Sequence, residues 1–459
     1  MKKLINHPVQ KILFGPPGSG KSLRARKIAS KLAVSTDCIV STTFHPSYDY
    51  GDFVVKLLPM TVMRKRHFHV CEKEGDQKFE IISPLADSVV EYNIYVGHLI
   101  RAVAKAITVG PEKSVLLIID EINRGDCSRI FGDMFQLLDR DLEGWSEYGI
   151  NISDITFSGL MKELGWTSHE SMEGQMWMNG EKIIRRGEQP PNILYKNNDK
   201  IASLFSKNPV LHFPPNLSIV GTMNTSDESV YFMDTAFKRR WEFEFVGWNY
   251  GSNSDPAIEA QRNLWLDGTN YKWLEFLTKL NKFIANTGGY KRVDDKQIGL
   301  WFLRAKPSNH YYKKILKLSF ISSPKVSDWE KLGFLKPPSH PDGHIVNWLD
   351  GLDVYMESIL KNKYSGEYDQ LVRVIEADGE KNPTPRLVAQ KLTQCVKWHD
   401  SIIVEDIRNK LMHFLWENVF SRDRSSLDKL IFGDGNERLR TFEEFISKDS
   451  EFVKAVMSS

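Results

Sequence analysis

Short apolar runs alternate with helical patterns between about Lys11 and Val246. Strands are predicted at KILF, CIVSTTF, SVLLIIDE, LSIVGTMNTSD and the alternating WEFEFV. Between them, SLRARKIASKLA, NIYVGHLIRAVAKAI (residues 93–107) and SRIFGDMFQLLDRD carry apolar residues at helical spacing. Strands that are apolar throughout and alternate with helices are typical of a parallel sheet covered on both faces. The pattern therefore predicts an α/β domain over residues 1–250.

Two insertions interrupt this alternation. Residues 62–90 predict a polar hairpin, and residues 144–210 form a longer polar insertion with scattered Trp and Gly. Insertions in such folds emerge at the ends of the sheet, where partners and ligands bind. The longer insertion is either a partner-facing element or a decoration without a special role. After residue 250 the pattern becomes helical, so we expect a mostly α-helical domain over 251–459, with a Pro-rich insertion at about 322–345.

Composition narrows the class of protein. The chain has 459 residues, of which 41% are hydrophobic, and 61 Lys and Arg nearly balance 59 Asp and Glu. This balance argues against nucleic-acid binding through bulk charge, although a local basic patch stays open. The four cysteines form no CxxC pair, and no segment reaches the roughly 20 apolar residues of a membrane helix. We therefore expect a cytoplasmic protein without a membrane span.

The stretch GPPGSGKS lies between a predicted strand and a predicted helix, as a phosphate-binding loop requires. Glycines let the backbone turn tightly and aim its N–H groups at phosphate oxygens. Lys21 would place a positive charge on the phosphates, and Ser22 would offer a hydroxyl to Mg²⁺. The residues predicted to bind the nucleotide are Gly15, Pro16, Pro17, Gly18, Ser19, Gly20, Lys21, Ser22 and Leu23.

Polar residues follow two further strands. LLIIDE ends in Asp120, which would hold Mg²⁺, and Glu121, which would polarise an attacking water. GTMNTSD places Asn224 and Asp227 where a side chain could reach the γ-phosphate or its water. The alternative for Asp120 and Glu121 is a strand that simply runs into a charged turn. The alternative for GTMNTSD is an Asx-turn after the strand.

A basic run ends the last predicted helix. In DTAFKRRWEF, Arg239 and Arg240 either form a solvated helix C-terminus or act on the nucleotide of a neighbouring subunit.

Together these stretches resemble the AAA+ domain of McrB-type motors, the GTPase motors of modification-dependent restriction, within a wider group that includes MoxR-like proteins. The resemblance covers about residues 12–246. The matching motifs are GPPGSGKS, FHPSYDYGDF, IIDEINRGDCSRIFGD, DRDLEGWSEYGI, GTMNTSDES and DTAFKRRWEF. A weaker likeness continues into KQIGLWFL, which resembles the lid motif, and IRNKLMHFLWENVF, which resembles the closing helix.

The resemblance implies a P-loop AAA+ fold, a parallel sheet with helices on both faces, followed by a helical lid. It implies that Glu121, Asn224 and Asp227 are catalytic and that Arg239 or Arg240 acts in trans. Asn123 and Arg124 would lie at the subunit interface, and Ser22 and Asp120 would hold Mg²⁺. The aromatic residues of FHPSYDYGDF would line the pore or a partner surface, unless they are ordinary core packing.

The resemblance further implies a homo-oligomer, expected to be a hexamer, with a McrC-like nuclease subunit and DNA bound through the complex. Its substrate would be GTP, favoured from the resemblance alone, or ATP. The sequence departs from the family at Glu228, where a basic residue is usual, and at Gln297 to Leu300, where the lid arginine is missing. Because the phosphate-binding loop begins at Gly15, we expect that the DNA-reading domain of the family is absent here. The alternative is a MoxR-like chaperone ATPase that remodels a protein.

Overall fold

The computed structural model describes residues 7–69, 80–171, 174–224, 231–249, 255–266, 269, 271–287, 296–304, 306–307, 400–421 and 423–458. The chain divides into two compact units, Met1–Trp248 and Asn249–Ser459, which are described separately. No described helix is both long enough and apolar enough to cross a membrane.

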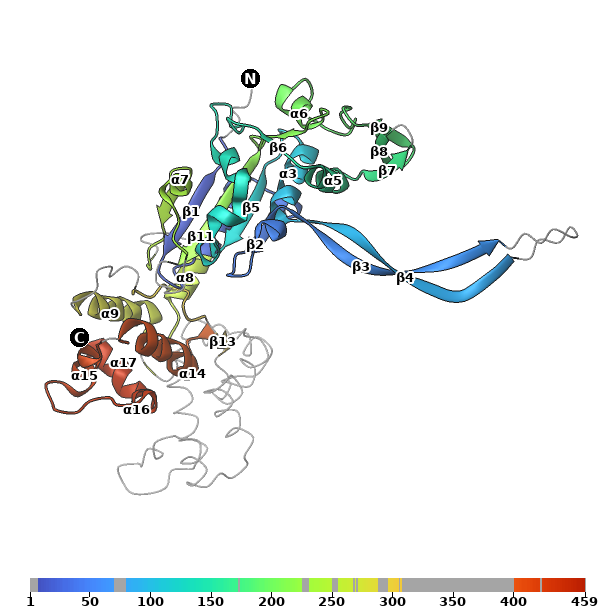
Figure 1. Cartoon of the computed structure of the whole chain (residues 1–459). Coiled ribbons are helices and arrows are strands. Elements are labelled where there is room, and N and C mark those ends of the chain that lie inside the picture. Colours follow the sequence, from blue (N-terminus) through green and yellow to red (C-terminus); the bar gives the residue numbers. More distant parts are fainter. Residues whose placement is uncertain are drawn as a thin grey trace, which may run out of the picture. The chain divides into compact units, whose positions relative to one another are not determined.

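A five-stranded parallel sheet forms the centre of the first unit (Figure 1). In spatial order its strands are β12 (Glu242–Phe245), β1 (Gln10–Gly15), β11 (Leu217–Asn224), β5 (Val115–Asp120) and β2 (Ile39–Thr43). The first five residues of β5 are buried, as are the first six of β11, because these strands have neighbours on both sides and helices above and below. The predicted α/β class, consistent with a P-loop AAA+ fold, is confirmed.

Helices flank this sheet. Helix α1 (Lys21–Lys31) packs on β1 and β11, whereas α3 (His98–Val109) packs on β5 and β2 and buries seven side chains. The remaining short helices near the sheet are η1 (Thr36–Cys38), α2 (Tyr50–Phe53), η2 (Ile122–Arg124), α4 (Cys127–Phe131), η3 (Gly132–Leu138) and α7 (Thr235–Lys238). Predicted helix 128–141 is therefore two segments, because the backbone breaks at Gly132, where φ is 54°.

The aromatic residues of FHPSYDYGDF mostly join the core. Phe44 and Phe53 are fully buried, and the Phe53 ring lies 4.8 Å from that of Phe131. Tyr48 stacks on Phe44 at 5.0 Å, and its hydroxyl lies 3.0 Å from His98 Nδ1. Burial raises the pKa of the Tyr48 phenol to about 12, so it stays protonated. Of the two interpretations of these aromatic residues, core packing holds for Phe44 and Phe53.

The first insertion is a long antiparallel ribbon, β3 (Val55–His69) paired with β4 (Glu80–Val96). The predicted hairpin is thus confirmed, and its paired stem extends beyond residues 62–90 on both sides. The helix predicted from Asn93 was wrong in its first turn, since β4 continues to Val96 and α3 begins at His98. Residues 94 and 96 lie on one face of β4, where a Cβ on Gly159 would be 3.4 Å from both side chains.

The second insertion folds as part of the same core. Its elements are β6 (Ile150–Asn151), α5 (Asp154–Glu163), β7 (Thr167–Ser171), β8 (Gly174–Asn179), β9 (Lys182–Arg185), α6 (Asp199–Leu204) and β10 (Val210–Leu211). Trp166 and Trp177 are 2% and 1% exposed and belong to the hydrophobic cluster that includes the central sheet. The scattered tryptophans of this polar segment therefore anchor it to the sheet domain.

Arg140 connects the start of the second insertion to the segment that follows its end. Its guanidinium donates to the carbonyls of Gly144, Phe213, Pro214 and Leu217 at 3.1 to 3.3 Å. Burial lowers the pKa of this guanidinium to about 9, and the negative charge of Asp141 offsets part of that effect. A lysine could satisfy fewer of these acceptors.

The second unit is mainly helical. Its elements are α8 (Pro256–Arg262), α9 (Trp273–Asn286), β13 (Lys306–Pro307), β14 (Asp400–Ser401), α14 (Val404–Asp406), the π-helical η5 (Ile407–Met412) and η6 (Leu415–Val419), α15 (Ser425–Phe432), α16 (Phe442–Ser447) and α17 (Asp449–Ser458). Ile298 and Leu300 of the lid-like motif are buried, and Asn281 bonds both backbone groups of Ile298 at 2.8 Å. The Pro-rich insertion at 322–345 lies outside the described residues.

We predict that Arg140→Ala lowers the free energy of unfolding by about 2–4 kcal/mol, because it leaves several partly buried carbonyls without a donor. Arg140→Lys should recover only part of the loss. Thermal denaturation of the full chain, with exposed Arg26→Ala as the control, measures this effect. Equal midpoints for Arg140→Ala and Arg26→Ala would contradict the role assigned to Arg140.

Candidate active site

Three glycines with positive φ shape the phosphate-binding loop. The φ angles of Gly15, Gly18 and Gly20 are 152°, 72° and 81°, which disfavour any residue with a Cβ. A Cβ on Gly15 would also lie 2.3 Å from the carbonyl oxygen of Val246. Gly20 is the N-cap of α1, so the loop leads directly into a helix N-terminus, where anions bind.

Polar groups inside the loop fit a bound phosphate. The Lys21 ammonium donates to the carbonyls of Gly15 at 3.0 Å and Pro16 at 2.9 Å, and the residue is 7% exposed. The buried Ser19 hydroxyl has no hydrogen-bond partner in the part of the chain that the structure describes. A buried, unsatisfied hydroxyl is costly, and a phosphate oxygen would satisfy it. The loop therefore has the cation and the free donor that a nucleotide phosphate requires.

Strand register brings the second group of predicted residues to the same edge of the sheet. Gly15 pairs with Asn224 across β1 and β11, and Thr43 pairs with Asp120 across β2 and β5. Because the strands are parallel, their carboxyl ends meet at one edge, the usual ligand site of such sheets. The loop, the two carboxylates and Asn224 thus share this edge.

One threonine holds the two carboxylates in place. The Thr222 hydroxyl donates to Asp120 Oδ1 at 2.9 Å and accepts from the Glu121 N–H at 3.2 Å. Asn224 Nδ2 donates to Glu121 Oε1 at 2.5 Å. Glu121 itself adopts a left-handed backbone, with φ 54° and ψ 45°, which is uncommon for a residue with a side chain. These contacts fix both carboxylates at the strand end.

Sequence reasoning missed Thr222. It lies on an apolar strand two residues before Asn224, and it is 3% exposed. A lone threonine within LSIVGTMN is equally well explained by β-propensity. The signal that could have found Thr222 is its spacing from Asn224, because side chains two residues apart lie on the same face of a strand.

Asn123 and Arg124, expected at a subunit interface, have different surroundings. Asn123 is 4% exposed, and its side chain donates to the Asn224 carbonyl at 2.8 Å. The backbone carbonyl of Asn123 accepts a hydrogen bond from the Tyr231 N–H at 2.8 Å. Arg124 has a half-exposed side chain, with Nε 3.7 Å from Glu121 Oε2. Asn123 therefore braces Asn224 within its own chain, while Arg124 faces outward beside Glu121.

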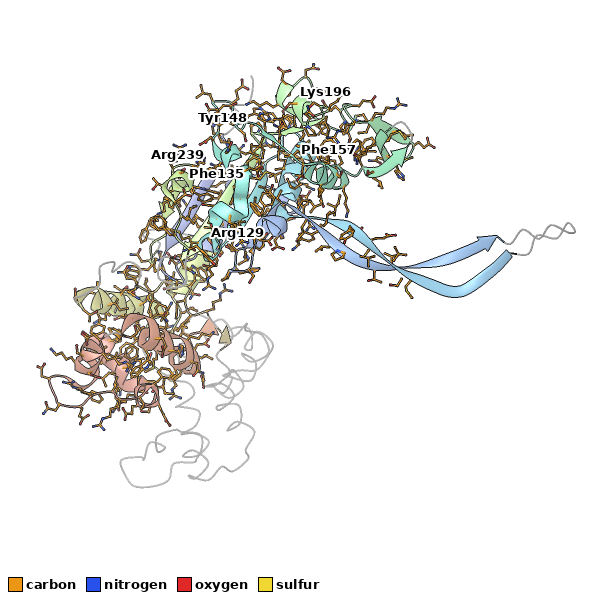
Figure 2. The ribbon with its side chains drawn as sticks, viewed as in Figure 1. Arg129, Phe135, Tyr148, Phe157, Lys196 and Arg239 are labelled. Carbon is orange, nitrogen blue, oxygen red and sulfur yellow. The ribbon has the colours of Figure 1, made fainter. Side chains whose placement is uncertain are left out.

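The two arginines that could act on the nucleotide of a neighbouring subunit have different surroundings. Arg240 bonds Asp139 Oδ2 through Nε at 3.0 Å and through Nη2 at 2.7 Å, and its guanidinium lies 4.5 Å from the Phe135 ring centroid. Its side chain is 7% exposed. Arg239 is exposed beside α7, and no described residue pairs with its side chain (Figure 2). Arg239 is thus the one that could reach a separate molecule.

The oxygens of Ser22 and Asp120 are the kind of donors that Mg²⁺ prefers. No group of three or more His, Cys, Asp or Glu side chains suited to a metal occurs within the described ranges. A cation at this edge would therefore need further oxygens from phosphates or water, as is usual for Mg²⁺. Asp227, predicted to support Asn224, lies outside the described residues.

We predict that Thr222→Val lowers nucleotide hydrolysis by roughly 10–100-fold, the typical effect of losing a group that orients catalytic ligands. The shape of the side chain is conserved, so thermal stability and nucleotide binding should change little. Thr108→Val, which removes a hydroxyl that bonds within α3, serves as the matched control. Steady-state phosphate release measures both variants, and equal rates for the two would contradict the role of Thr222.

Comparisons with known proteins give two similar chains, and no family model matches. The chain is 28% identical over 310 residues to the type II restriction enzyme BsuMI component YdiS of Bacillus subtilis, covering 65% of this chain and 73% of that protein. It is 25% identical over 240 residues to the type IV methyl-directed restriction enzyme EcoKMcrB subunit of Escherichia coli, covering 50% of this chain. That match spans 34% of the Escherichia coli protein, about a third of its length. Both similar proteins are components of restriction enzymes.

Proposed function

We propose that this protein is an AAA+ NTPase that acts as the motor subunit of a McrBC-like restriction system. In this proposal, hydrolysis in a hexameric ring drives a partner nuclease on DNA. The observation that carries the proposal is the meeting of the Lys21 loop with the braced Asp120, Glu121 and Asn224 at one sheet edge. The similarity to two restriction-enzyme components supports a role in a restriction system.

Each residue of the site has a distinct task in this proposal. The loop N–H groups and Lys21 bind the phosphates, which places the γ-phosphate at the carboxyl edge of the sheet. Ser22 and Asp120 would hold Mg²⁺, which supplies charge neutralisation of the phosphates. Glu121 Oε1 and Oε2 are the acceptors for the proton of the attacking water, and Asn224 orients that carboxylate.

An arginine from a neighbouring copy completes the site. Phosphoryl transfer spreads negative charge over the phosphate oxygens, and an arginine that stabilises it speeds the reaction by large factors. Arg239 is exposed and free of intramolecular pairing among the described residues, whereas Arg240 is held by Asp139. We assign the trans role to Arg239 and a positioning role to Arg240.

The substrate is GTP or ATP, and the resemblance of the sequence motifs to McrB-type GTPase motors favours GTP. Both similar proteins are named as a component or a subunit of a restriction enzyme, which fits a protein that works with other chains. A McrC-like nuclease subunit would supply DNA cleavage, and DNA would be bound through the complex. GTP and ATP hydrolysis by the pure chain, with and without a McrC-like nuclease subunit from the same host, tests this proposal.

Lys21→Ala should abolish nucleotide binding and hydrolysis, because it removes the cation that lies in the loop. Fluorescent GTP and ATP analogues measure binding, and phosphate release measures turnover. Lys27→Ala, a basic change on the same helix α1 outside the loop, is the matched control. Undiminished turnover by Lys21→Ala would rule the loop out as the nucleotide site. A chain that hydrolyses neither nucleotide with its partner present would refute the motor function.

Mixing two inactive variants tests the trans arginine. Lys21→Ala leaves Arg239 intact, and Arg239→Ala leaves the loop intact, so an interface between the two variants can restore one complete site. An equal mixture should regain up to roughly a quarter of the wild-type rate, since a quarter of random interfaces combine both intact parts. Mixtures of Lys21→Ala with Glu121→Gln should stay lower, because Glu121 acts in the same chain as its loop. No recovery with Arg239→Ala would show that this arginine does not act in trans.

A further inference from the structure

The pairing of β5 with β11 stops before β11 ends. The last paired residues are Ile119 and Gly221, whereas β11 continues to Asn224. Beyond this point η2 lies beside β11, and Ile122 packs so closely that a Cβ on Gly221 would lie 3.1 Å from its Cδ1. Backbone groups that leave a ladder inside a protein need other partners. On this side of β11, those partners must come from the η2 segment.

The Asn123 side chain supplies one of these partners. Its Nδ2 donates to the Asn224 carbonyl at 2.8 Å, and Asn224 Nδ2 in turn donates to Glu121 Oε1 at 2.5 Å. Glu121 is the N-cap of η2, two residues before Asn123. The bonds and the short stretch of chain therefore form a closed path through the three residues. This path fixes Asn224 relative to the carboxylate of Glu121.

The same path supports the uncommon backbone conformation of Glu121. A residue with a side chain stays in the left-handed region only where several contacts hold it there. Thr222 accepts from the Glu121 N–H at 3.2 Å, and Asn224 bonds its carboxylate. Because Asn123 holds Asn224, loss of the Asn123 amide would loosen one of these two supports.

The contacts of Asn123 lie within its own chain. The residue is buried, and its backbone carbonyl accepts from the Tyr231 N–H, so both its side chain and its backbone are engaged in the chain itself. The adjacent Arg124 is exposed. These contacts favour a role inside the chain over the interface role that the family resemblance implies for Asn123.

We propose that Asn123 is a positioning residue for the hydrolysis step, acting in the site of its own chain. It holds Asn224, and through Asn224 it holds the carboxylate of Glu121. The inference rests on the proposed function and adds to it a residue that acts through these two side chains. The phosphate-binding loop follows β1 and makes none of these bonds. Loss of the Asn123 amide should therefore slow turnover and leave nucleotide binding nearly unchanged.

Steady-state kinetics of Asn123→Ala and Asn123→Leu give the first measurement, and the leucine nearly keeps the size of the side chain. We expect kcat to fall roughly 10–100-fold, while KM and the affinity for fluorescent GTP and ATP analogues stay within about threefold. Asn216→Ala is the matched control. Asn216 is a buried asparagine directly before β11, and its side chain donates to three backbone carbonyls.

The control separates a positioning role from a structural one. Asn216→Ala should lose at least as much thermal stability as Asn123→Ala but keep its kcat per folded chain. Equal kcat for the two variants, or a parallel loss of binding and turnover in Asn123→Ala, would overturn the proposal. A wild-type chain without hydrolysis would instead count against the motor function.

The mixture of Lys21→Ala with Arg239→Ala gives the second measurement, because its complete sites take loop and carboxylates from the Arg239→Ala chain. Asn123→Ala added to that chain should lower the regained rate roughly 10–100-fold, whereas added to the Lys21→Ala chain it should change the rate less than about twofold. An effect on folding alone would appear in both mixtures. Equal losses, or the reverse order, would overturn the proposal. If the parent mixture regains nothing, the trans arginine is wrong and the kcat comparison decides the role of Asn123.

Discussion

Parallel pairing of β1 with β11, in the register that sets Gly15 opposite Asn224, is the constraint on which the rest of the site depends. This pairing places Gly15, the first residue of the phosphate loop, beside Asn224, whose side chain bonds Glu121. A shift of one residue would turn Thr222 and Asn224 to the other face and break their bonds to Asp120 and Glu121. The buried residues of β5 and β11 fix the register, so the hydrophobic core determines the geometry of the polar edge.

A continuous path connects this edge to the projecting ribbon. The N–H of Phe44, directly after β2, donates to the Asp120 carbonyl at 3.0 Å. The segment that follows Phe44 packs through Tyr48 and Phe53, and its end pairs with the ribbon base, where the Gly97 N–H donates to the Val54 carbonyl at 2.9 Å. In the proposed motor, changes at the carboxylates have a short, packed route to the ribbon.

The sheet and the loop could be predicted from the sequence because fully apolar strands and glycine spacing are local signals. The second insertion could not, since its polar composition hides Trp166 and Trp177, which pack on a core contributed by distant residues. The start of α3 was misplaced because apolar residues 94 and 96 fit both a strand and a helix. The division of roles between Arg239 and Arg240 depends on Asp139, 101 residues from Arg240, and no local pattern reports that ion pair.

Measuring nucleotide binding and turnover of Glu121→Gln side by side with the wild-type chain tests the central claim most directly. The amide keeps the size of the side chain but cannot accept the proton of the attacking water. The account predicts that the variant binds GTP or ATP as tightly as wild type, stays assembled with the bound nucleotide, and loses nearly all turnover. Wild-type turnover by Glu121→Gln would contradict the assignment of the braced carboxylate edge as the catalytic centre.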